Sequence, residues 1–147
     1  MYQKILVPTD GSALSKKAIK SAVELAAAVG AEVVALNVVP RYPMSYFEGG
    51  IDVAPSEVAR MERAWAEQGQ ALADDVAKAA AKAGVNAKAV TVRSDLVAEA
   101  ILAAARKHKC DLVVMASHGR KGLKRLLLGS ETQHVLTHGN IPVLVLR

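Results

Sequence analysis

Residues 4–12 read KILVPTDGS, and this stretch decides the fold class because it joins an apolar run to a turn and a helix start. Residues 4–9 form a β-branched and apolar run of strand length, and residues 10–12 supply turn formers and a capping hydroxyl. Over residues 13–29, apolar side chains recur at three- and four-residue steps, and Gly30 stands where a helix-terminating glycine is expected. The opening therefore predicts a strand followed by an amphipathic helix.

The rest of the chain repeats this alternation of apolar runs and segments of helical periodicity. Further strands are predicted at residues 32–39, 87–92, 111–116 and 141–146. Further helices are predicted to begin at Ser56, after the potential caps Ser94 and Asp95, and at Ser130. Strict alternation of strand and helix is typical of the α/β class, so we expect a parallel sheet of five strands with helices on both faces.

Length and composition are those of one globular domain spanning residues 1–147. With 52% apolar and 22% charged residues, the chain can bury a core, which excludes a disordered protein. No apolar stretch is long enough for a membrane span, and the N-terminus does not resemble a signal peptide, so a cytoplasmic location is expected. The single cysteine, Cys110, excludes an intrachain disulfide and is expected to act as a small hydrophobe.

The formal net charge of +5 is concentrated in one part of the chain. Residues 106–125 hold seven basic side chains and one acid, Asp111. Aromatic residues make up only 3% of the chain, too few for the stacking platforms that bind single-stranded nucleic acids. We therefore expect a compact anion site and neither a nucleic-acid nor a membrane partner.

The segment after the predicted strand 111–116 carries the clearest chemical signal. Two glycine turns, at Gly119 and Gly129, bracket a basic stretch. Gly119 permits a close backbone approach or a positive φ. A helix opening at Gly129-Ser130 would leave its first amides, those of residues 131–133, without intrahelical acceptors, and these amides suit a phosphate. The plain alternative is a capped helix start, with Ser130 and Gln133 forming a capping box.

Other nucleotide and catalytic motifs do not account for this segment. No Gly-Lys-Ser/Thr follows the glycines, and no Gly-x-Gly-x-x-Gly follows the first strand. The Gly-x-Ser-x-Gly elbow of serine hydrolases is also absent. His134 and His138 lie four residues apart but lack an evident third ligand, so no metal site is predicted. Since ligands of parallel sheets bind where the strand order reverses, the loops after residues 4–9 and 111–116 are the first places to look.

The whole chain resembles the UspA-like universal stress protein family. The resemblance is carried by residues 4–12, 111–115 and 142–145, and by the glycine-bracketed loop. The ATP-binding branch of the family has the pattern Gly-x2-Gly-x9-Gly-Ser/Thr, which is matched here by Gly119, Gly129 and Ser130. Ala116 replaces the first glycine and adds one methyl where the backbone would pass under the ribose, so it is expected to weaken or alter binding without abolishing it.

The resemblance implies a specific fold and a specific set of binding residues. The implied fold is the Rossmann-like adenine nucleotide alpha hydrolase type, with sheet order 3-2-1-4-5. The implied ligand is ATP, with Mg²⁺ or Mn²⁺ held mainly by the phosphates. The implied adenine pocket is the backbone around Pro8, Thr9 and Val38, with Asp10 near the ribose. The other implied nucleotide-binding residues are Met115, Ala116, Gly119, Arg120, Gly129, Ser130 and Glu131. A homodimer through residues 142–147 is also implied.

Three functions stay open at this point. The first is an ATP-binding universal stress protein, a nucleotide-responsive regulatory module with at most slow hydrolysis or self-phosphorylation. The second is an enzyme of the same superfamily that transfers adenylyl or phosphoryl groups, with His118 as the candidate chemical group. The third is a dimeric interaction protein without a nucleotide, favoured by Ala116. The aromatic residues 40–55 form a loop that either closes over the nucleotide or contacts another protein.

Overall fold

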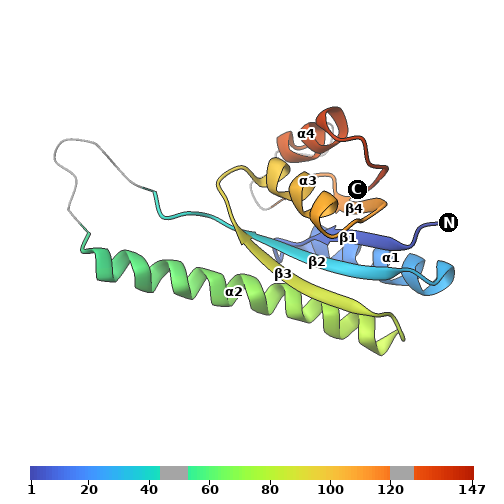
Figure 1. Cartoon of the computed structure of the whole chain (residues 1–147), viewed down its shortest axis with the longest axis horizontal. Coiled ribbons are helices and arrows are strands. Elements are labelled where there is room, and N and C mark those ends of the chain that lie inside the picture. The colour runs from blue at the N-terminus through green and yellow to red at the C-terminus, as the bar shows by residue number, and fades with distance from the viewer. Residues whose placement is uncertain (44–52, 120–127) are drawn as a thin grey trace.

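The computed structural model describes residues 1–43, 53–119 and 128–147. Its sheet has five parallel strands in the order β3-β2-β1-β4-β5, which confirms the predicted class and order (Figure 1). The strands are β1 (Lys4–Pro8), β2 (Glu32–Val39), β3 (Ala87–Arg93), β4 (Leu112–Ala116) and β5 (Val143–Leu146). The helices are α1 (Ala13–Val29), α2 (Pro55–Lys82), α3 (Val97–Lys107) and α4 (Ser130–His138).

Helices cover both faces of the sheet, as predicted. In Figure 1, α2 lies along one face of the sheet, and α3 and α4 lie on the other. Successive residues of β1 point to opposite faces: Ile5 and Val7 pack with α1 and α2, and Leu6 packs with α3 and α4. All three are fully buried. A strand buried on both faces needs the continuous apolar run that the sequence shows.

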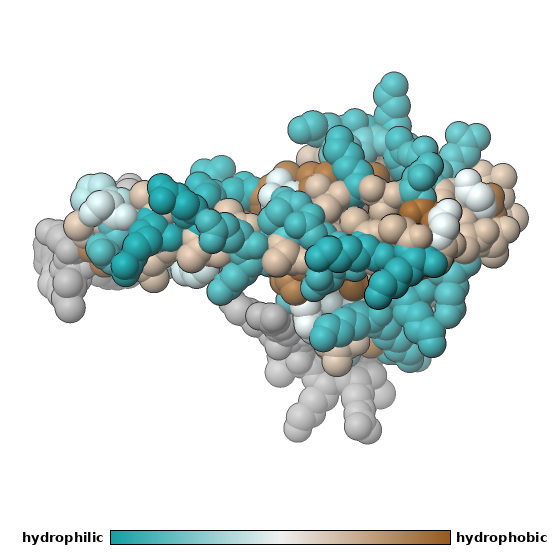
Figure 2. All heavy atoms as spheres, turned by 90° about the horizontal axis from the view of Figure 1, so that it is seen from below, coloured by the Kyte–Doolittle hydropathy of each residue, from teal (hydrophilic) through white to brown (hydrophobic). Residues whose placement is uncertain are grey.

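The outer surface of α2 is polar. Viewed from the side of this helix, the molecule shows mostly hydrophilic side chains along it, with small apolar patches between them (Figure 2). Its buried residues, Gly69, Ala73, Val76 and Ala80, lie at three- and four-residue spacings on the side that faces the sheet. Among the residues that the structure describes, no helix is long and apolar enough to cross a membrane.

The start of the predicted loop 40–55 packs against α2. The rings of Tyr42 and Trp65 stack with their centroids 6.0 Å apart and an interplanar angle of 19°. The backbone N–H of Tyr42 also donates to Glu62 Oε1 at 3.3 Å. Residues 44–52, which include the aromatic Tyr46 and Phe47, lie outside the described residues.

Helix ends agree with the sequence at α1 and differ at the starts of α2 and α3 described next, and at the cap of α4 described with the site. The Ser12 side chain accepts from the Ser15 N–H at 3.2 Å, and Gly30 ends α1 with φ 75°. Helix α2 begins at Pro55, one residue before the predicted start, because proline suits the first helical position. The predicted cap of α3 is wrong, since Leu96 occupies the N-cap position and makes no side-chain cap bond.

The two residues predicted to cap α3 stabilise the preceding loop instead. Ser94 Oγ accepts from the Leu96 N–H at 3.1 Å, and Asp95 Oδ1 accepts from the Arg41 N–H at 3.0 Å. Short polar side chains compete in this way between helix caps and local turns. The Asp95 bond ties the segment after β2 to the segment after β3.

The amino ends of β1 and β4 are joined by one carboxylate. Asp111 accepts from the backbone N–H groups of Gln3 and Lys4 at 2.8 and 3.0 Å. Desolvation acts to raise the pKa of Asp111, but these backbone hydrogen bonds outweigh it and hold the pKa below its ordinary value. Burial of the neighbouring Cys110 raises the pKa of its thiol to about 11, so the thiol stays protonated and is a weak nucleophile at neutral pH.

Candidate functional site

The loops after β1 and β4 meet at the carboxyl edge of the sheet. The chain leaves β1 toward β2 on one side, whereas β4 and β5 lie on the other, so the strand order reverses between β1 and β4. A β-carbon placed on Gly119, in the loop after β4, would lie 2.6 Å from Asp10 Oδ2, in the loop after β1. The backbone of Gly119 therefore lies close to the Asp10 carboxylate, and its φ is not positive.

Hydrogen bonds fix the loop that presents Asp10. Asp10 Oδ1 accepts from the Ser12 N–H at 2.9 Å, which forms an Asx turn. The Thr9 hydroxyl accepts from the Gly11 N–H at 3.3 Å and lies 3.4 Å from Ser15 Oγ. Thr9 is buried and Asp10 is half-buried. The carboxylate of Asp10 is thus held at the sheet edge before any ligand binds.

Asn37 holds this loop through a hydrogen bond to its backbone. The sequence did not lead us to expect this role. Asn37 lies in β2, is buried, and donates through Nδ2 to the Thr9 carbonyl at 2.8 Å. Gly69 of α2 makes room for it, because a β-carbon on Gly69 would overlap Asn37 Oδ1. The sequence does contain a signal for this role, because Asn37 is a polar residue in an otherwise apolar strand. A buried amide side chain needs a hydrogen-bond acceptor close by.

The N-terminus of α4 is anchored to the end of β4. The Gly129 N–H donates to the Ser117 carbonyl at 2.8 Å. The buried hydroxyl of Thr132 donates toward the carbonyls of Ala116 and Ser117, at 2.9 and 3.1 Å. A β-carbon on Gly129 would lie 3.1 Å from the Ser117 oxygen and 3.2 Å from His118 Cα. Gly129 therefore lets two backbone segments come close together at this edge, whereas Gly119 leaves room for the Asp10 carboxylate.

The predicted capping box at α4 is wrong, and this shifts the set of amides at the helix start. Gly129 is the N-cap residue, and the Gln133 side chain donates to the Leu128 carbonyl at 2.8 Å. The Gln133 N–H donates to the Gly129 carbonyl at 3.0 Å. The amides without an intrahelical acceptor are therefore those of residues 130–132, and not that of Gln133. Such a helix start attracts anions through its N–H groups and its dipole.

The Glu131 side chain has a structural contact of its own. Glu131 Oε2 accepts at 2.9 Å from the N–H of Ala98, the second residue of α3. A carboxylate at this position satisfies an amide at the start of α3 and interacts favourably with the dipole of that helix. Glu131 therefore contributes its backbone N–H, and not its side chain, to the group of amides at the start of α4.

The remaining predicted residues fall at the same edge, except for one that the structure does not describe. Pro8 ends β1, Val38 is the penultimate residue of β2, and Met115 and Ala116 are the last two residues of β4. Arg120, together with the neighbouring residues 121–127, lies outside the described part of the chain.

Three histidines, His118, His134 and His138, lie in the loop after β4 and in α4. Ser117 Oγ lies 3.1 Å from His118 Nδ1, within hydrogen-bond distance. The rings of His134 and His138 stack with their centroids 4.1 Å apart. Within residues 1–43, 53–119 and 128–147, no group of three or more His, Cys, Asp or Glu side chains is placed to hold a metal ion.

Comparison with known proteins establishes the family. The model of the universal stress protein family matches residues 1–147. This chain belongs to the universal stress protein family. The family assignment agrees with the parallel sheet and its strand order.

Individual universal stress proteins match over nearly the full length. Universal stress protein MJ0531 of Methanocaldococcus jannaschii is 35% identical over 154 residues, which cover 100% of this chain and 83% of the relative. The solved structure of MJ0577 from the same organism is 28% identical, with a TM-score of 0.84 and coverage of 99% and 96%. A universal stress protein solved in complex with cAMP is 26% identical, with a TM-score of 0.71 and coverage of 99% and 97%.

Proposed function

We propose that this universal stress protein is a cytoplasmic ATP-binding module that regulates other components of a stress response according to nucleotide state. The observation that carries the proposal is the contact between Asp10 and Gly119 where the strand order reverses. The anchored start of α4 lies at the same edge. The cAMP complex of a 26% identical family member supports an adenine nucleotide as the ligand class.

Different residues of the site would bind the adenine, the ribose and the phosphates of ATP. Pro8, Thr9, Val38 and Met115 would line the adenine end, and the Asp10 carboxylate can accept hydrogen bonds from ribose hydroxyls. The phosphates would contact Gly119 and Arg120, together with Gly129 and the amides of Ser130 and Glu131. The two glycines fit this role because β-carbons at either position would meet neighbouring atoms at 2.6–3.2 Å. Mg²⁺ or Mn²⁺ would be held mainly by the phosphates and would neutralise part of their charge.

Ala116 is the position where this chain departs from the ATP-binding pattern. Its carbonyl accepts from the Thr132 hydroxyl, so its backbone is held between β4 and α4. The extra methyl would narrow the space under the ribose. We propose that it lowers affinity rather than removing binding, and Ala116→Gly is then expected to bind Mg-ATP more tightly than the wild type.

Thermal unfolding with Mg-ATP tests the proposal. A ligand at 100 times its dissociation constant stabilises the native state by roughly 2.7 kcal/mol, so a clear rise in Tm is expected. Gly129→Arg should abolish this rise, because its side chain would meet Ser117 and His118. Ala79→Arg, which adds the same side chain at an exposed position of α2, should retain it. No rise with ATP, ADP or AMP at millimolar concentration contradicts ATP binding.

A transfer enzyme is the second candidate, and the contact between Ser117 and His118 is the observation that favours it. An imidazole within hydrogen-bond distance of a hydroxyl can act as a general base. This function predicts Mg²⁺-dependent transfer of an adenylyl or phosphoryl group to an identified acceptor, lost in His118→Ala. Mg-ATP binding without turnover favours the regulatory module, at most with slow hydrolysis or self-phosphorylation.

We further propose a homodimer through residues 142–147. β5 is an edge strand that pairs with β4, and Leu144 on it is 41% exposed. An edge strand with an apolar side chain can pair with the same strand of a second copy. If no adenine nucleotide binds, a dimeric interaction protein becomes the favoured function.

A further inference from the structure

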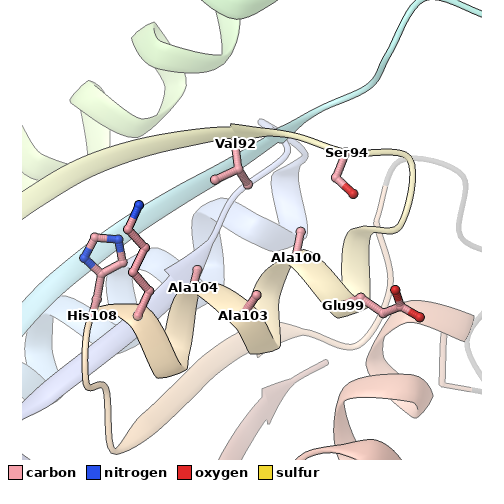
Figure 3. Close-up of a pocket in the computed structure, with 8 residues that line it drawn as sticks. Val92, Ser94, Glu99, Ala100, Ala103, Ala104 and His108 are labelled. Atoms are coloured by element: carbon pink, nitrogen blue, oxygen red, sulfur yellow. The ribbon is translucent and has the colours of Figure 1, made fainter.

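An apolar groove runs between β3 and α3. This hollow of about 320 Å³ is lined along its length by Val92 of β3 and by Ala100, Ala103 and Ala104 of α3 (Figure 3). Ser94 and Glu99 lie at one end, and His108 lies at the other. Helix α3 leaves β3 and crosses over β2 and β1, so the outer part of the β3 surface stays open beside it. None of the residues proposed to bind the nucleotide lines this groove.

A basic pocket adjoins the groove at the amino edge of the sheet. This second hollow, of about 380 Å³, is lined by four lysines, Lys4, Lys88, Lys107 and Lys109, as well as by His108. Glu32, which also lines the pocket, forms an ion pair with Lys4 at 3.5 Å. Across the described residues, no ion pair within 4.0 Å neutralises Lys88, Lys107 or Lys109. Three cations thus remain available to an anion.

Lys107 and His108 line both hollows, so the apolar groove and the basic pocket are adjacent at the C-terminal end of α3. Burial, together with the charges of Lys88, Lys107 and Lys4, lowers the pKa of His108. These lysines are therefore close enough to oppose a further positive charge. The C-terminus of α3 contributes only about half a negative charge, which does not offset three lysines.

We propose that the groove and the basic pocket together bind a free single-chain fatty carboxylate of medium length. The acyl chain would lie along Val92 and the alanines of α3, and the carboxylate would meet Lys107, Lys88 and Lys109. From Ala100 to Lys107 the helix rises by roughly 10 Å, which matches an acyl chain of about eight to ten carbons. Glu99 at the far end would repel a second anionic group, which favours a ligand with one charged head.

An NMR titration of the whole protein with decanoate tests the proposal. Three further compounds distinguish the contribution of the acyl chain from that of the carboxylate. Decanoate should perturb the signals of Val92, Ala103 and His108 and should saturate. Decyltrimethylammonium and a decyl glucoside carry the same chain on a cationic and a neutral head and should bind at least about tenfold more weakly, which is about 1.4 kcal/mol. Acetate should cause no saturable change. Equal binding of the cationic and anionic compounds would overturn the proposal, and so would the absence of saturation with decanoate.

Charge reversal on α3, with matched changes on α2, tests the same proposal by substitution. Lys107 and Lys82 are the last residues of their helices, and Ala103 and Ala79 are exposed alanines one turn earlier. Lys107→Glu and Ala103→Glu should each weaken decanoate binding by about tenfold, whereas Lys82→Glu and Ala79→Glu should leave it unchanged. Lys107→Met keeps the apolar stem without adding an acid and should also weaken binding. Decanoate binding that survives Lys107→Glu and Lys107→Met in folded protein would overturn the proposal.

Discussion

The backbone of Gly119 lies against the carboxylate of Asp10, so that a β-carbon on Gly119 would come within 2.6 Å of Asp10 Oδ2. This contact joins the loop after β1 to the loop after β4, at the point where the strand order reverses. Asp10 is in turn held by the Ser12 N–H, and Thr9 is held by Asn37. The candidate site therefore rests on close packing between two loops and on the hydrogen bonds that orient one of them.

Gly119→Val tests this close contact. The new side chain would overlap Asp10 Oδ2 and displace the carboxylate proposed to contact the ribose. We therefore expect Mg-ATP affinity to fall by about tenfold or more, since each 1.4 kcal/mol lost from the binding free energy is a factor of ten in affinity. Asn86→Val, at an exposed position at the opposite edge of the sheet, should leave affinity unchanged. Isothermal titration calorimetry measures both. Unchanged affinity in folded Gly119→Val would show that the nucleotide lies elsewhere.

Gly69→Ala tests the packing of α2 against Asn37, the residue that holds the loop after β1. Alanine is favoured over glycine inside a helix by about 1 kcal/mol, but the added methyl would overlap Asn37 Oδ1 and lie 2.8 Å from Val39 Cγ2. Overpacking of a core costs about 1–3 kcal/mol, so we expect a net loss of stability in urea unfolding.

The double variant Gly69→Ala/Asn37→Ala is the control for that experiment. Removal of the Asn37 side chain relieves the overlap, so the two changes should be non-additive, with the double variant more stable than the sum of the single effects predicts. Additive effects would mean that the two residues do not interact as described.

Much of this fold follows from local sequence signals. Residues 4–12 have an apolar run of strand length, a turn and a capping Ser12, and the structure uses each of them as predicted. Gly30 ends α1 in the left-handed conformation for the same local reason. At Ser12 and Gly30 a single residue determines the local conformation, and both predictions are confirmed.

Predictions that required a choice between neighbouring polar residues were less successful. Ser130 and Gln133 have the spacing of a capping box, but the Gly129 N–H is bonded to Ser117, which makes Gly129 the N-cap. Asn37 was missed because its acceptor, the Thr9 carbonyl, lies 28 residues away along the chain. Tertiary contacts of this kind have no periodic pattern in the sequence, so only the packed structure reveals them.

Acid unfolding tests the carboxylate that joins β1 and β4. Because the folded-state pKa of Asp111 lies below its ordinary value, this group stabilises the protein above about pH 4, and that stability is lost as pH falls through the folded-state pKa. In Asp111→Asn, Tm should be lower at pH 7 and should fall less steeply between about pH 5 and pH 3. Asp75→Asn on exposed α2 is the control, and its profile should follow the wild type. Parallel profiles for Asp111→Asn and the wild type would contradict this role.

Sedimentation analysis tests the proposed homodimer. Leu144→Lys would place a charge in the exposed edge strand, where desolvation and repulsion between copies oppose pairing. We expect a dimeric wild type and a monomeric variant. Leu136→Lys changes a similarly exposed leucine on α4 and should stay dimeric. A monomeric wild type, or a dimeric Leu144→Lys variant, would exclude residues 142–147 as the interface.

An NMR titration of the wild-type protein with Mg-ATP tests the central claim most directly, because it locates the nucleotide without any substitution. We predict saturable shifts of the backbone amides of Asp10, Gly119 and residues 129–132, with the phosphate end of the ligand assigned to the start of α4. The signals of Val92 and Ala103, in the groove beside α3, should not respond. Saturable shifts confined to the groove, or none at millimolar Mg-ATP, would contradict the assignment of the nucleotide site to the meeting point of the loops after β1 and β4.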